Sequence, residues 1–292
     1  MMNTPREKNN NLRSDLIELY LQRINSAWEA INANKHHANG SFAKKFEEVI
    51  NQDRLHPSAL ILQYAQSYLL VAIENLKHWC QLEKLYLENP HLGGLPILAP
   101  ISNIRVSIEN SATILWTLQD LRETENFQRV IQLAFEELST FRKYLSLMHN
   151  ELCKDSYSPS KINPLSHLND SCRENFENSQ IVFNSLNRFI EINGLSTTSF
   201  PRFTSGGDTK GLLFQLHGNQ LEILYSQLSG TVHGRYWSFR QNTTHTHTSE
   251  HPTAANVTSN TFTVNEDLLG SALNVAVSLM VGATNEYLSL FN

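Results

Sequence analysis

Apolar residues recur at the spacing of an α-helix along most of this chain of 292 residues. Residues three and four positions apart share one face of a helix, so the pattern predicts helices that bury one side. It predicts helices near 12–31, 42–50, 57–87, 97–121, 127–152, 172–192, 208–233 and 268–290. The expected fold class is therefore all-α, a multi-helix bundle.

One stretch departs from this helical pattern. Residues 236–239 and 261–264 alternate in the manner of β-strands around a loop rich in Thr, His and Asn. They predict a small β-hairpin near 235–264, inserted before the C-terminal helix. That helix contains small residues such as Gly270, Ala276 and Gly282, which would let it pack tightly inside the bundle.

Residues 154–170 form the best candidate for a boundary within the chain. They contain two prolines and several serines and asparagines, a composition typical of a linker or long loop. They separate an N-terminal helical part, 1–153, from a C-terminal helical part, 171–292. We expect the two parts to form one coupled globular unit.

The charge of the chain restricts its partners. The formal net charge is -5, with a pI near 6.2, and no long run of one sign occurs. No broad phosphate-binding surface is indicated, so RNA is a partner that charge does not favour. A homo-oligomer or a protein partner is the expectation instead.

The amino terminus and the cysteines indicate the compartment. The terminus is polar, and no segment reaches about 18 uninterrupted apolar residues, the length that spans a membrane. Cys80, Cys153 and Cys172 are odd in number and form no C-x-x-C pair, which is typical of reduced thiols. We therefore expect a cytoplasmic protein that does not contact a membrane.

The segment from Tyr225 to Trp237 is the most promising for chemistry. At 3.6 residues per turn, four polar residues form a stripe beside the apolar face, and Tyr225 borders it. These four are Glu222, Ser226, Ser229 and His233. His233 could act as a general acid or base with Ser229, Tyr225 or Arg235 as helpers. The alternative is a structural histidine that ties the helix end to the hairpin.

Arg105 and Glu109 are the interior charges of an otherwise apolar helix, 97–121. Burying a charge is unfavourable unless it is paired, so each should have a partner on another helix. Candidate partners are Glu222, His233 and Arg235. These residues would form either a structural ion-pair network or a polar binding site. Trp237 would be a further residue of that binding site.

The histidines between His245 and His251 invite a metal-site hypothesis, since imidazole is a common zinc ligand. Their spacing matches no metal motif, and the setting is that of a hairpin loop. Neither a metal nor another cofactor is expected.

The string Tyr-x-x-Leu-Ser-Gly-x-x-His-Gly, which begins at Tyr225, resembles a signature of uncharacterised helical bacterial proteins. There too it precedes a Trp-containing stretch. Arg105 and Glu109 followed by Trp116 resemble the same proteins. The resemblance covers mainly residues 97–290.

More distantly, residues 228–234 are similar to the closing motif of HEPN proteins. This helical superfamily includes RNA-cleaving toxins and antiviral defence proteins as well as inactive dimerising modules. Its catalytic motif pairs an arginine with a histidine about five residues later, and two chains of a dimer build one cleft. His233 matches the histidine. The arginine position falls on Leu228, so Arg235 or Arg105 would have to replace it.

We expect an intracellular, HEPN-like helical module that acts by assembly or ligand sensing, in a stress or phage-defence setting. One alternative is a metal-independent endoribonuclease with His233 as acid or base. A second is a small-molecule enzyme that uses Arg105, Glu109 and His233. An arginine that reaches His233 would favour the nuclease.

Overall fold

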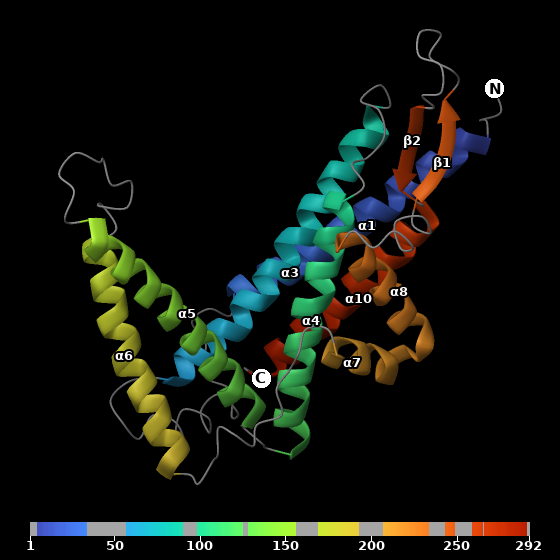
Figure 1. Cartoon of the computed structure of the whole chain (residues 1–292). Coiled ribbons are helices and arrows are strands. Elements are labelled where there is room, and N and C mark those ends of the chain that lie inside the picture. The colour runs from blue at the N-terminus through green and yellow to red at the C-terminus, as the bar shows by residue number, and fades with distance from the viewer. Residues whose placement is uncertain are drawn as a thin grey trace. The chain divides into compact units, whose positions relative to one another are not determined.

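The computed structural model describes residues 5–33, 57–89, 98–124, 128–155, 169–192, 207–233, 243–248, 259–264 and 266–290. Nearly all of them lie in helices, so the all-α class is confirmed. The helices are α1 (Pro5–Ala33), α3 (Pro57–Glu88), α4 (Leu98–Thr124), α5 (Gln128–Asp155), α6 (Asn169–Ile192), α7 (Gly207–His217), α8 (Asn219–Val232) and α10 (Glu266–Ser289) (Figure 1). The short helix expected near 42–50 lies outside the described residues.

The expectation of one helix over 208–233 is wrong. Helix α7 ends at His217 and α8 begins at Asn219. Gly218 between them has a φ of 71°, in the left-handed region that interrupts a right-handed helix. Apolar residues continue at helical spacing on both sides of the break, because both helices bury one face. The apolar periodicity therefore continues across the break between the two helices, and in the sequence only Gly218 indicates that break.

Two strands, β1 (Thr243–Thr248) and β2 (Ser259–Val264), lie between α8 and α10 in the sequence. They pair antiparallel, with Thr243 opposite Val264 and Thr248 opposite Ser259. The expected hairpin covers a longer stretch, near 235–264. Because 235–242 and 249–258 lie outside the described residues, the hairpin as a folded unit stays a prediction.

The chain divides into two compact units. Unit 1 combines Met1–His37, Gln66–Trp116 and Phe203–Ser289. Unit 2 combines Ala38–Ala65, Thr117–Arg202 and Leu290–Asn292. Each unit draws on chain from both sides of residues 154–170.

The core of unit 1 consists of apolar residues from its helices. Ile24, Ile73 and Trp79 are fully buried, and Ala276 of α10 is buried as well. Each large side chain removed from water contributes about 1.5–3 kcal/mol. The buried Ser107 hydroxyl of α4 donates to the Ala72 carbonyl of α3 at 2.9 Å, so its polar group is satisfied.

Helix α10 is the helix of the described part that is long and apolar enough to cross a membrane, by length and composition alone. Of its most apolar stretch of 18 residues, 50% is buried within the protein. Its buried face includes Ala272, Ala276, Met280 and Ala283. The small side chains allow close packing, as the sequence indicated, and the burial is typical of a core helix.

Helices α5 and α6 pack against each other in unit 2 through aromatic contacts. The rings of Phe135 and Phe183 lie 5.3 Å apart between centroids. The Arg142 guanidinium lies 4.1 Å from the centroid of the Phe183 ring and also donates to Gln180. An arginine over an aromatic face adds a cation–π attraction to the apolar packing.

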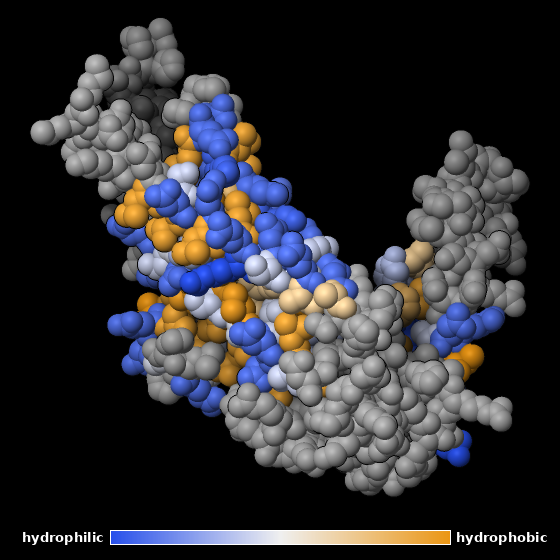
Figure 2. Space-filling model, turned by 180° about the vertical axis from the view of Figure 1, so that it is seen from behind, coloured by the Kyte–Doolittle hydropathy of each residue, from blue (hydrophilic) through white to orange (hydrophobic). Residues whose placement is uncertain are grey.

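The described surface mixes polar and apolar side chains, as the face drawn in Figure 2 shows. Three leucines of α1 are exposed at positions i, i+4 and i+7, which places them on one face of the helix. Leu12 is 62% exposed, Leu16 42% and Leu19 41%.

Two glycines that differ in backbone conformation provide a first test of this fold. Gly218→Ala should lower the free energy of unfolding by about 1–2 kcal/mol, because alanine is strained at positive φ. Gly211→Ala, inside α7, should raise it by roughly 0.5–1 kcal/mol, because alanine favours helix. A Cβ at either position meets no atom within 4 Å, so packing does not distort the comparison. Urea denaturation measures both, and equal effects of the two substitutions would contradict the helix break.

Candidate functional site

Helices α4 and α8 carry the charged cluster, and the cluster residues belong to unit 1. Helix α4 buries Ile101, Ile104 and Ile108 on its core face. Arg105 and Glu109 lie on the adjoining part of the helix and are half-buried. Their side chains therefore reach the neighbouring helix before they reach open solvent.

Helix α8 presents a complementary face. Its apolar side, Leu221, Leu224 and Leu228, is buried, as the sequence pattern predicted. Tyr225 lies at the edge of this apolar side and is also buried, with 1% of its surface exposed. A buried phenol needs a hydrogen-bond partner. Glu109 of α4 supplies it.

One oxygen of Glu109 is the centre of the cluster. Its Oε1 accepts a hydrogen bond from Arg105 Nε at 2.9 Å and lies 2.8 Å from Arg105 Nη2. The Tyr225 hydroxyl donates to the same oxygen. Arg105 and Glu109 thus pair along their own helix, and Glu109 also pairs with α8 through Tyr225, which was not among the partners that the sequence suggested.

The remaining nitrogen of the guanidinium, Arg105 Nη1, lies 3.3 Å from Nε2 of His233. Arginine can only donate, so Nε2 must be the acceptor, and the imidazole proton is then on Nδ1. His233 is the exposed residue that follows α8, and its backbone N–H donates to the Ser229 carbonyl at 3.1 Å. The arginine and histidine therefore meet where the cluster opens to solvent.

Two of the groups have shifted pKa values. Burial lowers the pKa of Arg105, but the negative charge of Glu109 and the hydrogen bonds to Tyr225 and Glu109 together outweigh this effect, so the net shift is upward. Burial raises the pKa of Tyr225 strongly, and its hydrogen bond to Glu109 and the carboxylate charge raise it further. The arginine thus stays charged and the phenol stays a donor throughout the physiological pH range.

The other residues singled out by the sequence lie elsewhere or outside the description. Glu222 takes no part in these hydrogen bonds, since it lies in the first turn of α8, about 16 Å along the helix from His233. Ser229 contributes its backbone carbonyl. Arg235 and Trp237 lie outside the described residues.

Sequence reasoning missed a second ion pair in unit 1. Arg13 of α1 donates to Glu83 of α3, which is 4% exposed. Like Glu109, Glu83 occurs among apolar residues at helical spacing. That setting is the feature of the sequence from which a buried ion pair could have been predicted. Among the described residues, no group of three or more His, Cys, Asp or Glu side chains is gathered to hold a metal ion.

The raised pKa of Tyr225 predicts how stability depends on pH. Above about pH 10 the unfolded chain releases this phenolic proton, whereas the folded chain retains it. The folded state then binds more protons, so the stabilisation is complete below pH 10 and is lost as pH rises above it. Tyr225→Phe should lose less stability than the wild type between pH 8 and pH 11.

Urea denaturation at both pH values measures this difference. Tyr144→Phe is the control, because Tyr144 is 56% exposed and its hydroxyl is not part of the cluster. Equal pH dependence of the wild type and Tyr225→Phe would contradict the raised pKa of this buried phenol.

Compared with protein-family models, curated proteins and solved structures, the chain has no significant match. The geometry of Arg105, Glu109, Tyr225 and His233 therefore carries the functional argument.

Proposed function

We propose that this protein is an HEPN-like, metal-independent endoribonuclease in which Arg105 and His233 act on the scissile phosphate. The observation that supports this is the 3.3 Å approach of Arg105 Nη1 to His233 Nε2. In the HEPN motif the arginine precedes the histidine on one helix, and here Leu228 occupies that position. Arg105 brings a guanidinium to the histidine from α4 instead.

The chemistry is an internal transfer at phosphorus. His233 Nε2 takes the proton from a ribose 2′-hydroxyl, and the 2′-oxygen forms a bond to phosphorus as the bond to the 5′-oxygen breaks. The leaving 5′-oxygen takes a proton from water, and the hydroxide so formed takes up the proton that His233 has accepted. The products are a 2′,3′-cyclic phosphate and a 5′-hydroxyl. Arg105 Nη1 donates to a non-bridging oxygen, where negative charge accumulates.

Glu109 and Tyr225 give the guanidinium its orientation. Nε and Nη2 of Arg105 are held by Glu109 Oε1, which leaves Nη1 directed at His233. Tyr225 holds the carboxylate in turn. An incoming phosphate has to replace only the contact with His233 in order to reach the arginine. A lysine at position 105 could not hold the carboxylate and the phosphate through one planar group.

The net charge of -5 predicts that RNA binds weakly and mainly at low salt. Few phosphates can be neutralised, so little affinity comes from counterion release. Cleavage should therefore be sought at low ionic strength with protein in excess.

The test is cleavage of an unstructured RNA in the presence of EDTA. His233→Ala and Arg105→Lys should each lower the rate by at least about 100-fold, as expected for loss of a general base or of charge stabilisation. The cleaved RNA should carry the cyclic phosphate. His78→Ala is the matched control, because His78 is an exposed histidine of α3. If the wild type is inert, or His233→Ala cleaves equally well, the proposal is wrong.

A second function, action by assembly, is favoured by the exposed leucines of α1. Leu12, Leu16 and Leu19 form a continuous apolar stripe on one face, and such surfaces commonly mark contacts between proteins. We propose self-association through this stripe, in a cytoplasmic stress or phage-defence setting. Assembly is compatible with RNA cleavage, since HEPN catalytic clefts form between two chains.

Sedimentation velocity tests the assembly. Leu16→Glu combined with Leu19→Glu should shift an oligomer to the monomer, because two charges would have to be buried in the interface. Leu147→Glu, at a 66% exposed leucine of α5, should leave the oligomer intact. A monomeric wild type would contradict the proposal, and so would an oligomer that persists in the double variant.

A further inference from the structure

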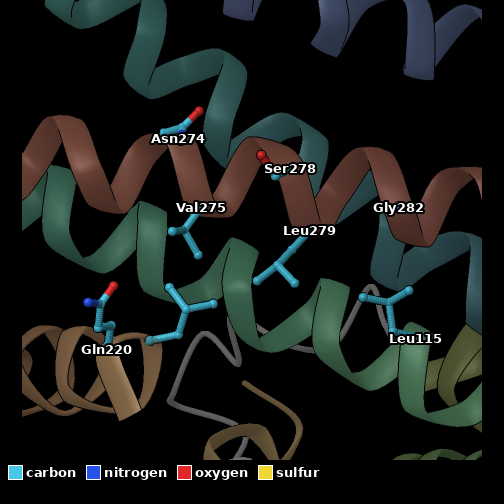
Figure 3. Close-up of a pocket in the computed structure, with 8 residues that line it drawn as sticks. Leu115, Gln220, Asn274, Val275, Ser278, Leu279 and Gly282 are labelled. Carbon is cyan, nitrogen blue, oxygen red and sulfur yellow. The ribbon is translucent and has the colours of Figure 1, made fainter. Parts of the chain in front are cut away.

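A pocket of about 450 Å³ lies between α4, α8 and α10, within unit 1. This volume is typical of sites for small organic ligands. Its lining residues are Leu115, Gln220, Leu221, Asn274, Val275, Ser278, Leu279 and Gly282 (Figure 3). The pocket is distinct from the charged cluster, since none of these residues belongs to it.

The lining has an apolar middle and polar borders. Leu115, Val275 and Leu279 point into the space between α10 and α4 (Figure 3). Gln220 lies at the α8 border, whereas Asn274 and Ser278 lie on the opposite side of α10 (Figure 3). A flat molecule could thus pack its face on aliphatic side chains while one of its edges meets the amide of Gln220.

The lining residues also exclude a charged ligand. None of the eight is ionisable. A phosphate or carboxylate placed here would lose hydration without gaining a counter-charge, which is costly. The ligand that fits is therefore neutral, unlike the phosphate group assigned to Arg105 and His233.

The amides favour a ligand whose edge alternates donors and acceptors. A side-chain amide offers an acceptor oxygen beside a donor nitrogen, the pairing with which proteins read nucleobase edges. Tyr20 of α1 donates to Asn274 Oδ1 at 3.3 Å, so the oxygen of this second amide is already engaged. Gln220 is exposed at the other border and supplies both kinds of group.

Gly282 keeps the pocket open. A Cβ at this position would lie 3.9 Å from Leu115 Cδ2, at ordinary contact distance. One carbon would be tolerated, but a longer side chain would extend into the pocket. A Cβ at Gly270 on the same helix would meet no atom within 4 Å, and Gly270 does not line the pocket.

We propose that this pocket binds an uncharged heterocycle of nucleobase or nucleoside size, with Gln220 reading its edge. This inference does not depend on RNA cleavage, because it rests on a different set of residues.

Adenosine, guanosine, cytidine and uridine are the probes, with binding measured by saturation-transfer NMR and by the shift in Tm. At least one of them should bind the wild type and Gly270→Leu, whereas Gly282→Leu should lose at least tenfold in affinity. Both substitutions replace a helical glycine by a better helix former, so they differ mainly in filling the pocket. Binding to His233→Ala should match the wild type, which separates this test from the nuclease test.

Gln220→Ala is a second variant, and it should leave the stability of the fold unchanged because Gln220 is exposed. It should lower the affinity for the nucleoside several-fold, because it removes one contact with the edge of the base. If no nucleoside binds the wild type, if Gly282→Leu binds equally well, or if Gln220→Ala changes nothing, the proposal is overturned.

Discussion

The pairing of Arg105 with Glu109 is the interaction on which this region of the protein depends. Both residues lie on a helix that otherwise buries isoleucines, so neither charge can be left unpaired. Their side chains are 16% and 20% exposed, so removing one partner should cost less than the about 3–5 kcal/mol lost when a fully buried pair is broken. Glu109 has capacity for one more donor, and Tyr225 provides it. This hydrogen bond holds α8 against α4 and places His233 beside the Arg105 guanidinium.

The break at Gly218 makes this docking feasible. A continuous helix over 208–233 would have had to follow a single direction, whereas α8 begins anew at Asn219. Helix α8 then contributes to both functional regions, since Leu221 lines the pocket and Tyr225 joins the cluster. These residues are one turn apart, so a ligand that displaces Leu221 would also disturb the phenol that holds Glu109.

The sequence predicted those parts of the site that have a local signature. Apolar periodicity located the helices, and two charges within an apolar run identified Arg105 and Glu109 as residues in need of partners. A polar stripe ending in a last-turn histidine identified His233. The pocket had no such signature, because its lining residues come from three helices and are ordinary on each. Spacing also left open which of Glu222, His233 and Arg235 the Arg105 guanidinium approaches, since that depends on how the helices pack.

The exposure of His233 bears on whether the cluster is only a structural connection. Arg105, Glu109 and Tyr225 already satisfy one another, so α4 and α8 would remain joined without the histidine. A contact at an exposed residue contributes at most about 1 kcal/mol. Stability alone therefore gives little reason for an imidazole at this position. An accessible imidazole nitrogen beside an oriented guanidinium suits proton transfer near a phosphate, and the roles proposed for Arg105 and His233 rest on this combination.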